Sequence, residues 1–129
     1  ATLHMLDPAV LAQYAVALVA KLWEENEKVR VKATSILGKL EPTVLAQHSA
    51  AVIAKLEDGE MDVCREAVWT LGKLEPTVLA QHAAAVVARL GHEDAGVRFA
   101  VLQTLGKLEP EMLSQHGASI TQWEERETN

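Results

Sequence analysis

Residues 40–56 read LEPTVLAQHSAAVIAKL, and residues 74–90 read LEPTVLAQHAAAVVARL. The two stretches lie 34 positions apart and differ only at Ser49/Ala83, Ile53/Val87 and Lys55/Arg89. The same spacing relates every proline, and it also relates one set of glycines and one of histidines: Pro8, Pro42, Pro76 and Pro110; Gly38, Gly72 and Gly106; His48, His82 and His116. A fixed period of about 20–50 residues indicates an array of repeated supersecondary units.

Each unit is predicted to contain two helices. The first opens with an acidic residue and a proline, as in Glu41-Pro42. Proline suits the first helical position, where its missing N–H would be unpaired anyway, and the carboxylate faces the positive end of the helix dipole. Apolar residues then recur at helical spacing, a polar stretch at 57–60 interrupts them, and a second stripe runs to Leu74. The second helix stops before the next proline, because the residue before a proline avoids helical geometry.

The repeated prolines and glycines also set the boundaries of the units. The complete units are residues 7–40, 41–74 and 75–108. Residues 1–6 are predicted to be the remnant of a preceding second helix, because Leu3 and Leu6 align with Leu37 and Leu40. Together with the absence of an initiating Met, this suggests a piece of a longer array. Residues 109–129 are predicted to form a closing half-repeat and C-terminal cap, since polar Thr121 and Glu124 stand where earlier units have apolar residues.

Composition narrows the function classes. The chain has 129 residues, 49% of them apolar, a formal net charge of −6 and one cysteine. Such a composition is neither disordered nor stapled by disulfides, and a lone thiol fits a reducing, cytoplasmic location. The uncharged run 8–20 is shorter than the roughly 20 residues of a membrane span, and no basic segment of a signal peptide precedes it. With 18 acidic against 12 basic residues, the balance argues against nucleic-acid binding.

The second helices carry a pattern that resembles the HEAT-repeat family. Its typical Val-Arg, Ala and Leu-Gly positions correspond to Val29-Arg30, Ala33 and Leu37-Gly38 in the first unit. The second unit has Val63-Cys64, Ala67 and Leu71-Gly72, and the third has Val97-Arg98 and Leu105-Gly106. This resemblance implies an all-α, right-handed α-solenoid of antiparallel helical hairpins with about seven helices. It also implies a scaffold without enzymatic activity, which binds a protein or peptide along a concave surface lined by the second helices. Tetratricopeptide repeats share the repeat length, but their aromatic and alanine spacing does not match.

The resemblance also predicts an incomplete ladder between units. In the family, acidic and arginine side chains pair from one repeat to the next. Here Cys64 replaces the arginine of the second unit, and the acidic column reads Glu24, Asp58 and His92.

Candidate binding residues occupy the columns that vary between units. A helical wheel directs two positions of each second helix away from the apolar stripe. If the second helices line a groove, the residues that project into it are Val31, Arg65 and Phe99, and Ser35, Trp69 and Gln103. Trp and Arg are frequent interface hot spots, so Trp69 is the leading contact, although it could instead only cover its neighbouring helices. A row of Lys39, Lys73 and Lys107 borders this face and either favours an acidic partner or simply solvates the edge.

No catalytic, cofactor or metal site is predicted. Equivalent histidines on stacked helices lie roughly 8–10 Å apart, too far to share one ion, so each is expected to be half-buried and to donate to a loop carbonyl. His92-Glu93 is similar to the dyads of the HEAT-like deoxyhypusine hydroxylases, but lies in a turn and not in a second helix. Cys64 has no histidine placed to activate it, and a lone helical cysteine is usually a small buried hydrophobe.

Three alternatives remain open at this point. The chain could be a HEAT-like enzyme subunit of the bilin-lyase type, or an engineered consensus array without a native partner, as the near-identity of two units suggests. It could also self-associate through its N-terminal face, where Leu3, Leu11 and Leu18 are expected to be exposed.

Overall fold

The computed structural model describes residues 7–108, and all regular elements in this range are helices. Short 3-10 turns at Lys55–Glu57 and Ala88–Gly91 continue two of them. The α-helices are α1 (Pro8–Lys21), α2 (Glu27–Leu37), α3 (Pro42–Gln47), α4 (Ser49–Ala54), α5 (Met61–Leu71), α6 (Pro76–Gln81), α7 (Ala83–Val87) and α8 (Ala95–Leu105). The all-α prediction is confirmed for this range. The prediction for residues 1–6 and 109–129 lies outside it.

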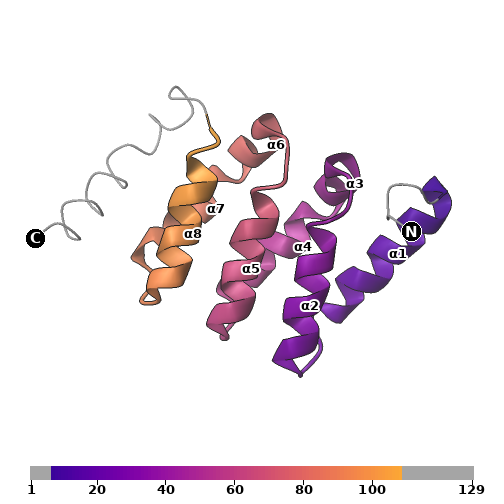
Figure 1. The fold of residues 1–129 in the computed structure, drawn as a ribbon, viewed down its shortest axis with the longest axis horizontal. Helices are drawn as coiled ribbons and strands as arrows, with labels where there is room; N and C mark the ends of the chain where they lie inside the picture. Colours follow the sequence, from indigo (N-terminus) through magenta and orange to yellow (C-terminus); the bar gives the residue numbers. More distant parts are fainter. Residues whose placement is uncertain (1–6, 109–129) are drawn as a thin grey trace, which may run out of the picture.

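The three second helices stand side by side in one row, with α4 and α7 behind them and α3 and α6 at the upper end of the row (Figure 1). Helix α5 packs against α2 on one side and against α8 on the other. These helices begin at Glu27, Met61 and Ala95. The handedness of the array and its solenoid geometry stay predictions.

The first helices of the second and third units are broken, and this corrects the predicted helix count. The three hairpins within residues 7–108 predict six helices, whereas the structure has eight. His48 (φ −118°, ψ 14°) and His82 (φ −109°, ψ 9°) leave the helical region and separate α3 from α4 and α6 from α7. At each break the histidine N–H donates to the carbonyl three residues earlier, at 2.9 Å, which tightens the turn. In α1, which is unbroken, Tyr14 occupies the same position.

Side chains cap several helix starts. Asp7 Oδ1 accepts a hydrogen bond from the N–H of Ala9 at 2.8 Å, and Asn26 Oδ1 accepts one from Lys28 at 2.8 Å. Asp94 Oδ2 accepts one from the N–H of Val97 at 2.9 Å. Each bond satisfies a backbone donor that the first turn leaves unpaired. The helices therefore begin where polar residues precede the apolar stripes.

The core is built from aliphatic side chains that recur unit by unit. Leu37, Leu45, Leu71 and Leu79 have no exposed surface. The expectation that Leu11 and Leu18 are exposed is wrong, because both belong to this core and are only 7% and 8% exposed. They lie on the inward side of α1, which packs against α2 and α3. Leu3 lies outside the described residues.

Glycines mark the closest approach between second helices. A Cβ atom added to Gly72 would lie 3.0 Å from Lys107 Nζ and 3.3 Å from Thr104 Oγ1 of the next unit. In the same interface, Thr104 Oγ1 donates to the carbonyl of Val68 at 3.3 Å. One unit earlier, Thr70 Oγ1 donates to the carbonyl of Thr34 at 3.0 Å and lies 3.2 Å from a Cβ placed on Gly38. A small residue at this position lets the following threonine reach the backbone.

Gly106 provides an internal control for this role. Within residues 7–108, a Cβ there meets only carbonyl oxygens of its own chain segment, at 3.4 and 3.5 Å. Both Gly72 and Gly106 have φ near −60°, which alanine adopts freely. We expect Gly72→Ala to lower the free energy of unfolding by about 1–2 kcal/mol through crowding. Gly106→Ala should instead be neutral or raise it by about 0.5 kcal/mol, because alanine restricts the unfolded chain. Urea unfolding followed by circular dichroism measures both, and equal effects would contradict the packing role.

Candidate protein-binding groove

A groove of about 480 Å³ crosses the exposed side of α2, α5 and α8. It collects six of the nine residues predicted to bind a partner: Ser35, Lys39, Trp69, Lys73, Gln103 and Lys107. Each second helix contributes residues because the two variable positions and the lysine recur on the same side of each helix. We call this hollow the lysine groove.

Trp69 is the largest side chain of the lysine groove. It is half-buried and packs against the core, and its ring meets that of Phe99 edge to face, with centroids 6.4 Å apart and planes at 68°. Phe99 itself is 57% exposed and does not line the groove. Trp69 therefore covers its neighbours while one surface faces the groove, and its contact with a partner stays a prediction.

The three lysines have different surroundings. Lys107 Nζ reaches back from the end of α8 and donates to the carbonyl of Gly72 at 2.8 Å, so it caps the end of α5. Lys39 and Lys73 follow the corresponding ends of α2 and α5 and are exposed. Cations suit these places because the helix dipole makes a C-terminus negative.

The remaining predicted residues lie elsewhere on this face. Val31 lines an adjoining hollow of about 320 Å³, together with Glu27, Asp62 and Glu66. The two hollows share Ser35 and Glu66. Arg65 pairs with Asp62 on its own helix, and its guanidinium lies beside Gly96 at the start of α8.

Sequence reasoning missed three lining residues, Gly38, Thr70 and Glu66. Gly38 and Thr70 belong to columns treated as framework. Glu66 occupies a column that varies from Lys32 to Ala100, and this variation is a signal that could have identified it.

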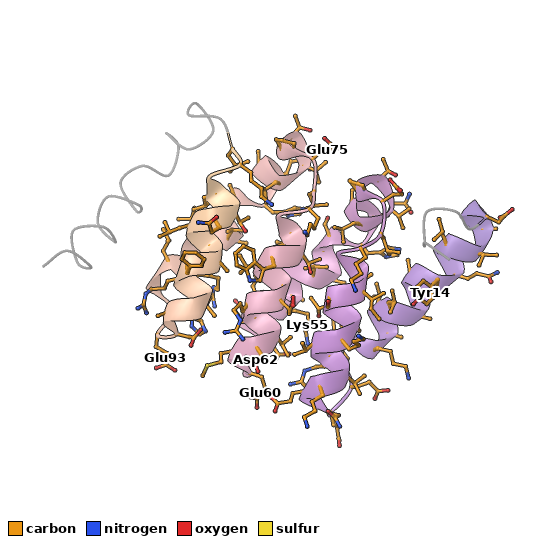
Figure 2. The ribbon with its side chains drawn as sticks, in the orientation of Figure 1. Tyr14, Lys55, Glu60, Asp62, Glu75 and Glu93 are labelled. Carbon is orange, nitrogen blue, oxygen red and sulfur yellow. The ribbon has the colours of Figure 1, made fainter. Side chains whose placement is uncertain are left out.

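The adjoining hollow holds charges of both signs, because Lys28 and Lys32 line it together with Glu27, Asp62 and Glu66. A hydrogen bond between the Glu27 and Glu60 side chains, together with their electrostatic repulsion, raises the pKa of Glu60. Figure 2 shows Glu60 and Asp62 at the lower end of α5, and Glu93 at the lower end of the α8 region. Charges are therefore mixed near the N-terminal ends of the second helices, whereas a lysine follows each C-terminal end.

Behind the groove, an ion network joins the first two units. Asp58 Oδ2 lies 2.9 Å from Arg30 Nε and 3.3 Å from Lys55 Nζ. Lys55, which Figure 2 places between α2 and α5, also donates to the carbonyl of Leu22 at 3.0 Å, and its ammonium lies 4.9 Å from the centre of the Trp23 ring. Burial alone raises the pKa of Asp58, but hydrogen bonds from the Glu60 N–H, Arg30 and Lys55 outweigh it, so this pKa lies below its ordinary value.

The corresponding junction between the second and third units has different chemistry. Cys64 stands in the arginine column, is fully buried, and directs its Sγ to the carbonyl of Leu56 at 3.1 Å. Burial raises the pKa of this thiol, which keeps it neutral. His92 replaces Asp58, and its Nδ1 accepts from the Asp94 N–H at 3.0 Å. Nε of Arg89, the counterpart of Lys55, is buried without a hydrogen-bond partner in the described part of the chain. The ladder is incomplete at this junction, as predicted.

The second histidine of the predicted column contacts the preceding unit. His82 is half-buried, as expected, but its Nε2 lies 3.1 Å from Ser49 Oγ rather than at a loop carbonyl. The hydroxyl is available because Ser49 lies in the preceding unit at the position where the third unit has Ala83. His116 lies outside the described residues.

An apolar hollow of about 350 Å³ lies where α1 meets α2. It is lined by Leu18, Val29, Ala33 and Ile36 and bordered by three lysines: Lys21, Lys28 and Lys32. Val29 is 37% exposed, and Val16 and Trp23 on α1 and just after it are 60% and 56% exposed. The apolar exposure at this end therefore comes from these residues, and not from Leu11 and Leu18.

Two searches within residues 7–108 found nothing: no group of three or more His, Cys, Asp or Glu residues could hold a metal ion, and no helix is long and apolar enough to cross a bilayer. No protein-family model matches the chain, and no curated protein is significantly similar to it.

Proposed function

We propose that the protein is a non-enzymatic, HEAT-like repeat scaffold that binds a protein or peptide in the lysine groove. The main support is that residues which vary between units come together in space: Ser35, Trp69 and Gln103, from three successive second helices, line one hollow. Around them, the leucine framework and the inter-unit threonine bonds repeat. Such a division between a constant framework and variable exposed residues is typical of solenoids that bind along a concave surface. A right-handed solenoid with this face inward is part of the proposal.

Trp69 supplies the main anchor in this proposal. A half-buried aromatic ring is already held by its neighbours, so little conformational freedom is lost when a ligand packs on it. Its edge-to-face contact with Phe99 fixes the ring further. Polar groups from Gln103 and Ser35 lie on the same lining and can bond a peptide backbone.

The test begins with peptides selected from a random phage-displayed library on the immobilised protein. We expect Trp69→Ala to weaken the selected peptides by about thirtyfold, the effect of losing a 2 kcal/mol hot spot. Met61→Ala is the matched control, since Met61 is an exposed apolar residue on the same helix, outside the groove. Fluorescence anisotropy measures the affinities, and circular dichroism checks the fold. Unchanged affinity in both Trp69→Ala and Arg65→Ala would show that binding occurs elsewhere.

A further inference from the structure

We infer that the ligand of the lysine groove is an acidic peptide that places a carboxylate beside an apolar side chain. This inference rests on the proposed function and specifies the chemistry of its partner. The observation behind it is that Lys39, Lys73 and Lys107 come from three successive units and line the same 480 Å³ hollow as Trp69. Glu66 is the single acidic residue of that lining.

The charges on the groove are available to a ligand. Lys107 uses one of its three ammonium N–H groups for the Gly72 carbonyl, and within residues 7–108 the other two are left for a ligand. Lys39 and Lys73 are exposed. Glu41 and Glu75 lie two residues beyond these lysines, at the starts of α3 and α6, and do not line the hollow; Figure 2 shows Glu75 at the upper edge of the molecule.

The lysine groove carries more positive charge than its surroundings. Acidic and basic residues are mixed in the adjoining hollow, where Glu27, Asp62 and Glu66 lie together with Lys28 and Lys32, whereas the described lining of the lysine groove has three lysines and Glu66. An acidic chain is therefore attracted to the lysine groove, which places it over Trp69. Crossing three helices requires about 20 Å, which is about six residues of extended chain.

A peptide explains the lining better than a polynucleotide does. A long nucleic-acid backbone would need a continuous basic track, but Glu27, Asp62 and Glu66 lie in the hollow that adjoins the groove, and the chain carries a net charge of −6. Trp69 instead offers a half-buried surface next to the cations, which fits an aliphatic side chain adjoining a carboxylate.

The experiment uses the complete chain and fluorescein-labelled synthetic peptides in which a central leucine is flanked by two glutamates. Matched peptides carry glutamines or lysines in place of the glutamates. We expect the glutamate peptide to bind at least about tenfold more tightly than the glutamine peptide in low salt, and the difference to shrink as salt screens the charges. Lys39→Glu with Lys73→Glu should remove this preference. Lys21→Glu, the same charge change on α1 outside the lysine groove and its adjoining hollow, should retain it.

The outcomes separate this inference from the proposed function. Binding that requires Trp69 but shows equal affinity for all three peptides, or a preference for the lysine peptide, would overturn the inference and leave the scaffold function standing. Tighter binding of a single-stranded oligonucleotide, or competition by inorganic phosphate alone, would also overturn it. Binding of no peptide, including any selected from the library, would overturn both.

Discussion

Replacing Asp58 by alanine should lower the free energy of unfolding by about 3 kcal/mol. The side chain is 5% exposed and neutralises two cations, Arg30 and Lys55, whose side chains are only 14% and 10% exposed. Removing the shared acid leaves both charges buried without compensation, and this is the costly way to break a buried ion pair. Urea unfolding at neutral pH, followed by circular dichroism, measures the change.

Two further variants test whether this effect comes from the buried charges. Asp62→Ala breaks the Arg65 pair, whose side chains are 39% and 60% exposed, and should cost no more than about 1 kcal/mol. In the structure the Glu60 N–H donates to Asp58 Oδ1 at 2.9 Å. Asp58→Asn keeps this acceptor oxygen but loses the charge, so its loss of unfolding free energy should lie between those of Asp58→Ala and Asp62→Ala. A loss in Asp58→Ala no larger than in Asp62→Ala would contradict the network's role.

The Asp58 carboxylate should also make the stability of the protein sensitive to acid. Its folded-state pKa is lowered, so its stabilising contribution is present above its unfolded pKa, near 3.8, and is lost as pH falls through the folded value. The wild-type protein should therefore lose more stability below about pH 4 than Asp58→Asn does, because the variant has no charge to lose there.

Cys64→Arg should destabilise the protein by about 3 kcal/mol although it restores the residue expected in that column. The new guanidinium would enter a fully buried position close to Arg89, which bonds the same Leu56 carbonyl as Cys64, and His92 stands where the first junction has the pairing acid Asp58. Adding His92→Asp supplies the missing carboxylate and reproduces the Arg30–Asp58 arrangement of the first junction. The two substitutions should therefore couple favourably by about 1–3 kcal/mol in a double-mutant cycle.

His92→Asp alone is the third corner of the cycle. An aspartate at position 92 can accept from the Asp94 N–H, as His92 Nδ1 does, and can also bond Arg89. We expect this variant to match or exceed wild-type stability by up to about 1 kcal/mol. If the changes in unfolding free energy of Cys64→Arg and His92→Asp simply add in the double mutant, an arginine and an aspartate at these positions do not interact, and the Arg30–Asp58 geometry of the first junction must depend on other residues.

Much of the fold follows from local signals in the sequence. Pro42 and Pro76 mark helix starts, because proline has only one comfortable place in a helix, and Leu45 and Leu79 are buried because they belong to stripes at helical spacing. The breaks at His48 and His82 could not be predicted in this way. The apolar pattern continues across them, and each break depends on the backbone angles of one residue.

Those parts of the candidate site that depend on which face of a helix a residue occupies could be predicted from the sequence. Trp69 and Gln103 share the groove because a wheel places them on one side of their helices. Phe99 lies outside the lining although it contacts Trp69, and Lys107 folds back onto Gly72. Both depend on how far a long side chain reaches across to the next helix, which no pattern within one helix describes.

The bonds between units also bear on how fast the chain folds. Side chains of one unit bond the neighbouring unit across separations of 28 to 36 residues, from Arg30–Asp58 to Thr104–Val68. Forming any one of them closes a loop of about one unit, wherever it lies in the chain. Lengthening the array adds more such loops without making them longer, so the entropy lost per contact stays constant as the chain grows. Folding can therefore spread from one junction to the next at a rate set by a single unit rather than by the total length.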